Sequence, residues 1–153
     1  MLNLFHVKQI KACETSVKHC ETLKIIKMAQ NSINLGQLGE NLATDYLTKK
    51  HYRLISRNFR KPWGELDIIA FDRKTKETVF FEVKTVRAEK ILAHEQLTPF
   101  KLRRIKRTIL SYLAIHPEIT NWRFDWIGIT FYNSNQKTED YELEHINNIE
   151  LNY

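Results

Sequence analysis

Two short stretches decide how this sequence folds: GELDIIA at residues 64–70 and FFEVK at residues 80–84. Both are apolar, have the length of a strand and carry isolated charges, and the short polar stretch 72–77 between them is typical of a hairpin turn. Side chains alternate across a strand, so Glu82 and Lys84 share one face while their apolar neighbours point to the other. The pattern therefore predicts a β-hairpin with a charged pair on one face of its second strand.

Three charged residues of this hairpin form a candidate catalytic centre. Asp67 lies between apolar neighbours, where a buried charge is costly unless it is paired or binds a metal. Asp67 and Glu82 can hold Mg²⁺, which typically uses one or two carboxylates together with water and substrate phosphate. Lys84 can orient or deprotonate an attacking water and counter the charge that develops on a phosphate. Glu65 is a secondary candidate on the face of Asp67. The alternative interpretation of Asp67, Glu82 and Lys84 is a structural salt-bridge cluster.

The segments around the hairpin predict an α/β domain. Residues 34–50 have the apolar arc of a helix, with Asn34 as its N-cap. A second helix is expected to begin at Thr98-Pro99 and to be stopped by Pro117. Strands are expected at about residues 52–59, 65–71, 78–86, 123–132 and 141–146.

Length and composition favour one domain in the cytoplasm. The 153 residues, 42% of them hydrophobic, suit a single core. No run approaches the roughly 20 apolar residues of a membrane span, and the lysines near the start are not followed by the apolar run of a secretory signal. Cys13 and Cys20 lack the CxxC spacing of a zinc site and form no disulfide framework. We therefore expect a cytoplasmic protein without a membrane partner.

Residues 1–33 differ from the rest of the chain, because they hold both cysteines and show little periodicity. We expect a poorly patterned N-terminal extension at 1–33 and, at 34–153, a folded domain that carries the candidate catalytic centre. An alternative is that translation begins at Met28, just before the first patterned helix. The intact mass of the natural protein distinguishes the two, since a mass equal to that of the full chain excludes a start at Met28.

Positive charge is concentrated in the middle of the chain. Residues 49–107 hold 17 Lys and Arg against 7 Asp and Glu, whereas residues 108–153 hold 2 against 7. A central positive region of this kind suits a polyanionic partner such as nucleic acid, whose phosphates supply most of the non-specific affinity. The alternative is a solvated surface with an uneven charge distribution.

Several short motifs follow one another in an order and spacing that are specific together, although each alone is weak. They are Gly39-Glu40-x-x-Ala43, Asn58, Gly64-Glu65-x-Asp67, Glu82-Val83-Lys84, Lys101 and Arg123-Phe124-Asp125. In these motifs the chain from about residue 35 to 146 resembles the YraN family, small bacterial proteins of the restriction-endonuclease-like, PD-(D/E)xK, nuclease superfamily.

This resemblance implies a restriction-endonuclease-like three-layer fold, with a central mixed sheet flanked by helices, similar to archaeal Holliday junction resolvases. It implies that Asp67, Glu82 and Lys84 are catalytic and that Glu40, Asp67, Glu82 and the backbone carbonyl of Val83 bind Mg²⁺ or Mn²⁺. The expected activity is that of a metal-dependent endonuclease that hydrolyses phosphodiester bonds in DNA, with branched or recombination and repair intermediates among its substrates.

Two other functions stay open beside the nuclease. One is a catalytically inactive nucleic-acid-binding or recombination accessory protein with the same fold, and the other is a protein-interaction module. Binding needs basic groups and not buried carboxylates, so the acidic set favours the nuclease. Junction-cutting enzymes commonly act as symmetric dimers, so a homodimer is an alternative to a monomer.

Basic residues near the predicted site are the candidate nucleic-acid contacts: Lys101, Arg104, Arg87, Arg103 and Arg107. Lys101 lies at the edge of the core face of the second helix, where it can reach the scissile phosphate or simply extend to solvent. Arg103, Arg104 and Arg107 face outward and either bind phosphates or solvate the helix. Arg87 follows Val86, which stands where family members usually have an arginine, so substrate contacts at this strand end differ from the family pattern.

The remaining residues of interest have mainly structural interpretations. Arg123 and Asp125 lie on the same side of a strand and are expected to form a structural pair. Trp63 is expected to pack over the adjacent turn, with stacking on a base as the alternative. The six histidines show no metal-ligand spacing, and His94 and His145 are expected at the surface.

Overall fold

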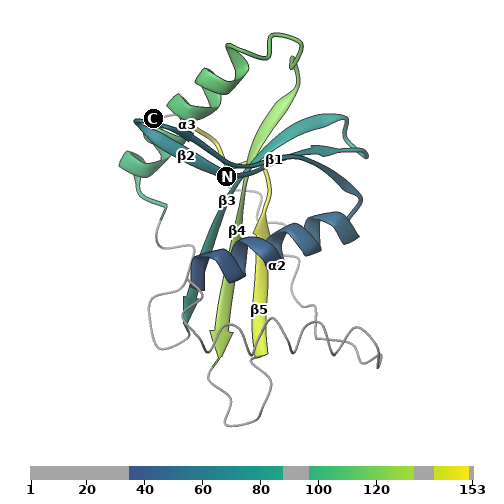
Figure 1. Ribbon diagram of the computed structural model, residues 1–153, viewed down its shortest axis with the longest axis vertical. Coiled ribbons are helices and arrows are strands. Elements are labelled where there is room, and N and C mark those ends of the chain that lie inside the picture. Colours follow the sequence, from purple (N-terminus) through teal and green to yellow (C-terminus); the bar gives the residue numbers. More distant parts are fainter. Residues whose placement is uncertain (1–34, 88–96, 133–139, 152–153) are drawn as a thin grey trace.

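The computed structural model describes residues 35–87, 97–132 and 140–151 (Figure 1). Its elements are α2 (Leu35–Lys49), β1 (Tyr52–Lys61), β2 (Gly64–Asp72), β3 (Glu77–Arg87), α3 (Pro99–Leu113), β4 (Trp122–Tyr132) and β5 (Asp140–Ile146). The predicted order of helix, three strands, helix and two strands is confirmed. The N-terminal extension, Met28 and the Asn34 cap lie outside the described residues.

The five strands form one mixed sheet in the order β1-β2-β3-β4-β5. Antiparallel pairing joins β1 to β2, β2 to β3 and β4 to β5, whereas β3 and β4 run parallel. A parallel pair needs a long crossover, which here contains α3. The α/β class with a central mixed sheet is therefore confirmed.

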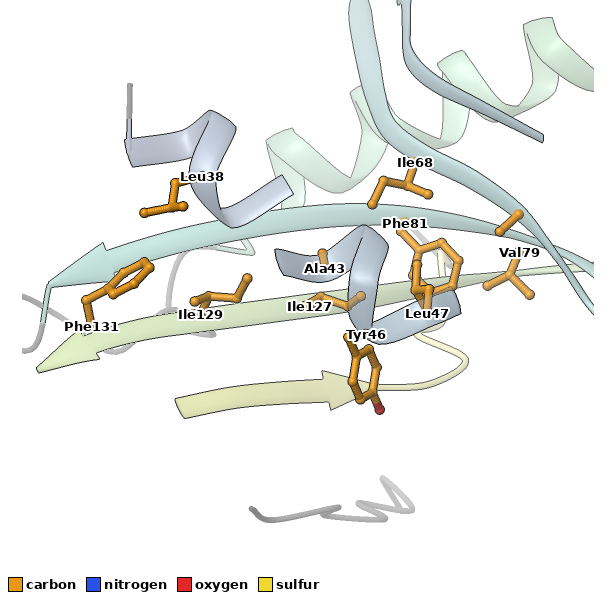
Figure 2. Close-up of a cluster of buried hydrophobic side chains, with 11 residues drawn as sticks. Leu38, Ala43, Tyr46, Leu47, Ile68, Val79, Phe81, Ile127, Ile129 and Phe131 are labelled. Atoms are coloured by element: carbon orange, nitrogen blue, oxygen red, sulfur yellow. The ribbon is translucent and has the colours of Figure 1, made fainter. Parts of the chain in front are cut away.

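The two helices cover opposite faces of the sheet. On β3, Val79 and Phe81 belong to the core cluster beneath α2, whereas Phe80 between them belongs to the cluster beneath α3. Figure 2 shows the first cluster, in which Ala43 and Leu47 of α2 lie over the sheet. Each fully buried large apolar side chain stabilises the fold by roughly 1.5–3 kcal/mol, so both faces contribute to the core. The result is three layers: helix, sheet and helix.

The start of α3 follows the sequence signals. Thr98 is the N-cap, and its Oγ1 accepts a hydrogen bond from the backbone N–H of Lys101 at 3.3 Å, while Pro99 occupies the first turn. The helix ends at Leu113, before Pro117 is reached. Within the described part of the chain, neither helix has the length and the apolar character that crossing a membrane requires.

A close helix-to-strand contact fixes α2 against β3. A Cβ atom added to Gly39 would lie 1.7 Å from Thr85 Oγ1, so only glycine allows this approach. This approach also places Glu40, the next residue of α2, near the sheet.

Candidate active site

The site lies where β2 and β3 separate. Their paired residues run from Asp72↔Glu77 to Ile68↔Phe81, and Asp67 comes one residue later on β2. There the Oδ2 atom of Asp67 accepts a hydrogen bond from the backbone N–H of Val83 at 2.7 Å. A side chain thus bridges the two strands where their backbone pairing ends, and Asp67 is held beside residues 82–84.

Glu82 and Lys84 point toward the α3 side of the sheet, as the alternation predicted. The Oε1 atom of Glu82 lies 2.5 Å from the Nζ atom of Lys101 on α3, and the side chain of Glu82 is only 11% exposed. Lys84 is half-buried and pairs with Gly128 across β4. We refer to Asp67, Glu82, Lys84 and Lys101 together as the site cluster.

Burial and like charge act together on the two carboxylates. Burial and then the charge of Glu82 raise the pKa of Asp67 to about 7, against the lowering effect of the Val83 N–H. Burial also raises the pKa of Glu82, although the Lys101 ammonium and, more weakly, Lys84 oppose this. Negative charge at this site is therefore only partly compensated by the protein.

Glu40 approaches the same site from α2. Its Oε2 atom accepts hydrogen bonds from Asn58 Nδ2 at 3.0 Å and from Arg57 Nη2 at 3.4 Å, and its side chain is 20% exposed. The charge of Glu40 contributes to the raised pKa of Asp67. The Glu40 side chain is therefore partly enclosed, and its carboxylate is held by β1.

Asn58 has a role at the site that the sequence analysis did not assign. It has a φ of 52° within β1, and it lies between the pairs Arg57↔Ile68 and Phe59↔Leu66, which places it opposite Asp67. Asparagine adopts this left-handed conformation more readily than most residues. Asparagine is also disfavoured inside strands, and this was the signal that could have identified its role.

Two of the predicted nucleic-acid contacts hold the turn between β1 and β2. Arg104 Nε donates a hydrogen bond to the carbonyl oxygen of Trp63 at 2.8 Å. The guanidinium of Arg107 lies 4.5 Å from the centre of the Trp63 ring, a cation–π contact. Trp63 therefore packs at the turn, as expected, with the helix arginines as its partners.

The other basic candidates are placed differently. Lys101 contacts a carboxylate of the site, whereas Arg103 is exposed on α3 and Arg87 is exposed at the end of β3. The secondary candidate Glu65 is exposed and pairs with Arg60 at 3.2 Å. The charge of Glu65 still contributes to the raised pKa values of both buried carboxylates.

A second buried charged cluster is centred on Arg123, and it confirms the predicted structural pair. Arg123 Nε donates to Asp125 at 3.1 Å, Nη1 donates to Glu77 at 2.6 Å and Nη2 donates to Asp72 at 3.0 Å. Thr75 and Tyr52 accept further hydrogen bonds from the same guanidinium. We call these residues, with His145, the Arg123 cluster.

His145 corrects one prediction, because it is buried and not at the surface. It is 6% exposed, with Nε2 lying 3.0 Å from Asp125 Oδ2 and Nδ1 lying 3.3 Å from the hydroxyl of Tyr46. A histidine on an edge strand gives no sequence signal for burial, since its partners come from α2 and β4. His94 lies outside the described residues.

The donor set of the site cluster suits a hard cation. Among residues 35–87, 97–132 and 140–151, no three His, Cys, Asp or Glu side chains are placed so that they would hold a metal ion. Asp67 and Glu82 nevertheless provide two buried carboxylates whose charges raise each other's energy. Mg²⁺ needs only one or two carboxylates when water and phosphate complete its shell, so these residues fit it.

The comparison with protein families agrees with the motifs. Residues 39–129 match the family described as Uncharacterised protein family UPF0102. The chain belongs to this family. It is the YraN family that the motifs indicated, and the matched region includes Glu40, Asp67, Glu82 and Lys84.

The match to relatives with the same family name covers most of the length of each relative. A UPF0102 protein of Chlorobium phaeobacteroides is 40% identical over 75% of this chain and 92% of the relative. Relatives in Geobacter sulfurreducens and Geobacter metallireducens are 43% and 42% identical over 78% and 82% of this chain, which correspond to 91% and 100% of those proteins. The similarity therefore extends over nearly the whole of each relative.

Proposed function

We propose that this UPF0102 member is a nuclease that hydrolyses phosphodiester bonds in DNA with Mg²⁺ or Mn²⁺. The observation that supports this most is the pair of buried carboxylates, Asp67 and Glu82, whose pKa values are both raised at the point where β2 and β3 separate. A purely structural cluster would favour carboxylates whose negative charge is compensated by cationic side chains of the protein. A divalent cation provides the compensation that the protein itself supplies only in part.

In this proposal Asp67 and Glu82 bind the metal, with the carbonyl of Val83 as a further ligand. Glu40 would join them only after its side chain moves, since no three such side chains of the described residues are placed to hold a metal. When bound, the metal supplies Lewis acidity and lowers the pKa of a coordinated water. The protein fixes the carboxylates: the N–H of Val83 orients Asp67, and β4 supports Glu82 and Lys84 through parallel pairing. These residues come from β2 and β3, which hold them more rigidly than loops would.

Lys84 is the residue that we assign to the attacking water. It lies on the same face of β3 as Glu82, two residues further along the strand. Its charge opposes the rise in the pKa of Glu82. The ring of Trp126 lies over Gly128, the partner of Lys84, because a Cβ at Gly128 would lie 2.2 Å from that ring. This apolar floor lowers the local dielectric constant, which strengthens the effect of the ammonium on a phosphate.

The architecture supports a restriction-endonuclease-like fold. Helices cover both faces of a mixed sheet, and the hairpin presents Asp67 opposite Glu82-Val83-Lys84. The excess of positive charge in residues 49–107 supports a nucleic-acid substrate. Arg87, three residues after Lys84, and Arg103, two residues after Lys101, are exposed and are the residues that we assign to further phosphate contacts.

A non-catalytic nucleic-acid-binding protein is the second candidate, and the contact between Lys101 and Glu82 favours it. This ion pair at 2.5 Å puts an internal cation on a carboxylate that the nuclease needs for metal. In such a protein the site cluster would only stabilise the sheet. Metal binding and cleavage then distinguish the two candidates.

Cleavage by the purified full-length protein tests the proposal. Labelled four-way junctions, flaps, single strands and duplexes are incubated with Mg²⁺ or Mn²⁺ and with wild type, Lys84→Ala or Lys106→Ala. Lys106 lies on α3 and is not part of the site cluster, so its variant controls for the loss of one positive charge. We expect Lys84→Ala to reduce cleavage by about 10²–10³-fold, the usual effect of removing one electrostatic contact to the transition state.

Two outcomes would contradict the nuclease. One is equal cleavage by wild type and Lys84→Ala, which would point to a contaminating enzyme. The other is a double failure of the wild type. It cleaves no substrate, and calorimetry detects no Mn²⁺ binding, or only binding that Asp67→Ala leaves unchanged. Salt-sensitive DNA binding in that case would identify the accessory protein.

A further inference from the structure

We propose that Lys101 is an exchangeable counter-ion of Glu82, which the metal displaces so that the lysine becomes a contact for the substrate phosphate. This inference rests on the proposed function, because it assumes that Glu82 binds a metal. It makes Lys101 a substrate-binding residue that links metal binding to nucleic-acid binding.

The contact between the two residues is close and built into the fold. Lys101 Nζ lies 2.5 Å from Glu82 Oε1, and the Glu82 side chain is 11% exposed. Among the ionic effects on Glu82, the charge of Lys101 is the main one that favours the carboxylate. Lys101 therefore occupies the position that a cation bound to Glu82 would need.

A metal ion and the ammonium cannot share this carboxylate without cost. Both are positive, and at contact distance in a partly buried site the repulsion between them is poorly screened. One carboxylate oxygen can also accept only a limited number of short contacts. Binding of the metal to Glu82 therefore requires that Lys101 moves away.

Lys101 is able to make this movement while its helix stays in place. Its backbone N–H is fixed by the Thr98 side chain at the start of α3, whereas its side chain is 33% exposed. A lysine carries a point charge on a flexible four-carbon stem, so the ammonium can rotate toward solvent at little cost. Once there, it lies beside the metal-bound carboxylates, where a substrate phosphate would approach.

This exchange predicts a specific pattern of linkage. Without nucleic acid, Lys101 competes with the metal and weakens its binding. With a phosphate present, Lys101 has a new partner, so nucleic acid and metal each strengthen the binding of the other, and by the same factor. Removal of Lys101 abolishes both effects.

Calorimetric titration of Mn²⁺ into the metal-free full chain tests the first effect. We compare wild type, Lys101→Met and the matched control Lys106→Met, at about pH 8 so that Asp67 is mostly ionised. We expect Lys101→Met to bind Mn²⁺ about tenfold more tightly than wild type, and Lys106→Met to stay within about twofold of wild type. Lys101→Arg, which keeps the charge, should resemble wild type, and thermal unfolding verifies that each variant is folded.

Fluorescence anisotropy with a labelled oligonucleotide tests the second effect. Lys84→Ala is the background, so that cleavage does not remove the probe. Addition of Mn²⁺ should increase DNA affinity in this background, and the increase should largely disappear in Lys84→Ala/Lys101→Met but not in Lys84→Ala/Lys106→Met.

The outcomes separate this inference from the proposed function. Equal or weaker Mn²⁺ binding by Lys101→Met, while wild type binds Mn²⁺ and Asp67→Ala does not, overturns the counter-ion role and leaves the nuclease intact. Absence of Mn²⁺ binding by wild type and by Lys101→Met overturns both.

Discussion

Two buried charged clusters lie on the same sheet, one at the start of β3 and one at its middle, and they are built in opposite ways. The Arg123 cluster surrounds one guanidinium with three carboxylates, and all three guanidinium nitrogens donate hydrogen bonds. The site cluster instead brings Asp67 and Glu82 together, and Lys101 contacts Glu82. The buried charges of the Arg123 cluster therefore compensate one another, whereas those of the site cluster do so only in part.

The pKa values show what this difference means. Burial acts to raise the pKa of Asp72, but the N–H of Lys74 and the Arg123 side chain outweigh it, so that the pKa is lowered. Burial and the charge of Glu82 raise the pKa of Asp67 to about 7. A cluster that only stabilises the fold favours the charged form of its acids, whereas a cluster that awaits a ligand tolerates charges that oppose one another.

The largest expected effect is at the Arg123 cluster. Arg123→Met would leave Asp125, which is fully buried, without its guanidinium partner. Removal of one member of a buried ion pair typically costs about 3–5 kcal/mol, and we expect this loss in the free energy of unfolding, measured by urea denaturation. The exposed Arg103→Met provides the control and should change stability by less than about 0.5 kcal/mol. Similar values for both variants would show that the Arg123 cluster does not stabilise the fold.

The second prediction compares two aspartates of β2 that should respond with opposite sign. Asp67→Asn removes a charge whose pKa is raised to about 7, and we expect it to stabilise the metal-free protein by about 2 kcal/mol at pH 8. Asp72→Asn removes a charge that Arg123 and two backbone N–H groups favour, and we expect it to destabilise the protein by about 1.5 kcal/mol at the same pH.

The pH dependence of these effects follows from the direction of each shift. The folded state holds the proton of Asp67 more tightly than the unfolded state, so ionisation costs stability as the pH rises from about 4 through 7. The gain from Asp67→Asn should therefore vanish at about pH 4 and below. The lowered pKa of Asp72 contributes stability that is present above its unfolded value and is lost as the pH falls through the folded value. Destabilisation by Asp67→Asn at pH 8 would mean that Asp67 is an ordinary structural residue.

Sequence periodicity was sufficient for the elements and for the carboxylates of the site. The alternation in residues 80–84 placed Glu82 and Lys84 on one face, and the helix start at Thr98-Pro99 was found from its capping signals. These features depend on neighbours in the sequence, which a local pattern contains. Glu40 came from the family motif.

The features that were missed depend on distant partners. His145 is buried because Asp125 and Tyr46 meet it from other elements, and no local pattern contains that information. Lys101 was open to two interpretations, since the position of Glu82 beneath α3 decides its role. Asn58 required knowledge of a positive φ and of its place opposite Asp67.

The smallest expected effect concerns how α2 is held against the sheet near each of the two clusters. Near the Arg123 cluster, Tyr46 of α2 contacts His145, whereas near the site cluster α2 relies on the close approach of Gly39 to Thr85. Gly39→Ala would place its Cβ 1.7 Å from Thr85 Oγ1 and 3.0 Å from Thr85 Cβ, and rotation of the Thr85 side chain cannot relieve the second contact. The helix must therefore move outward, and Glu40 with it.

We expect this movement to cost about 1 kcal/mol of unfolding free energy, because overpacking outweighs the gain in helix propensity from alanine. Thr85 Oγ1 is buried without a hydrogen-bond partner among the described residues, so Thr85→Ala removes the obstacle without breaking a hydrogen bond. The double variant should lose less unfolding free energy than the sum of the losses of the two single variants. A double-mutant cycle measured by urea denaturation gives this difference. Additive losses would mean that α2 does not depend on this contact, and that Glu40 is positioned by Asn58 and Arg57 alone.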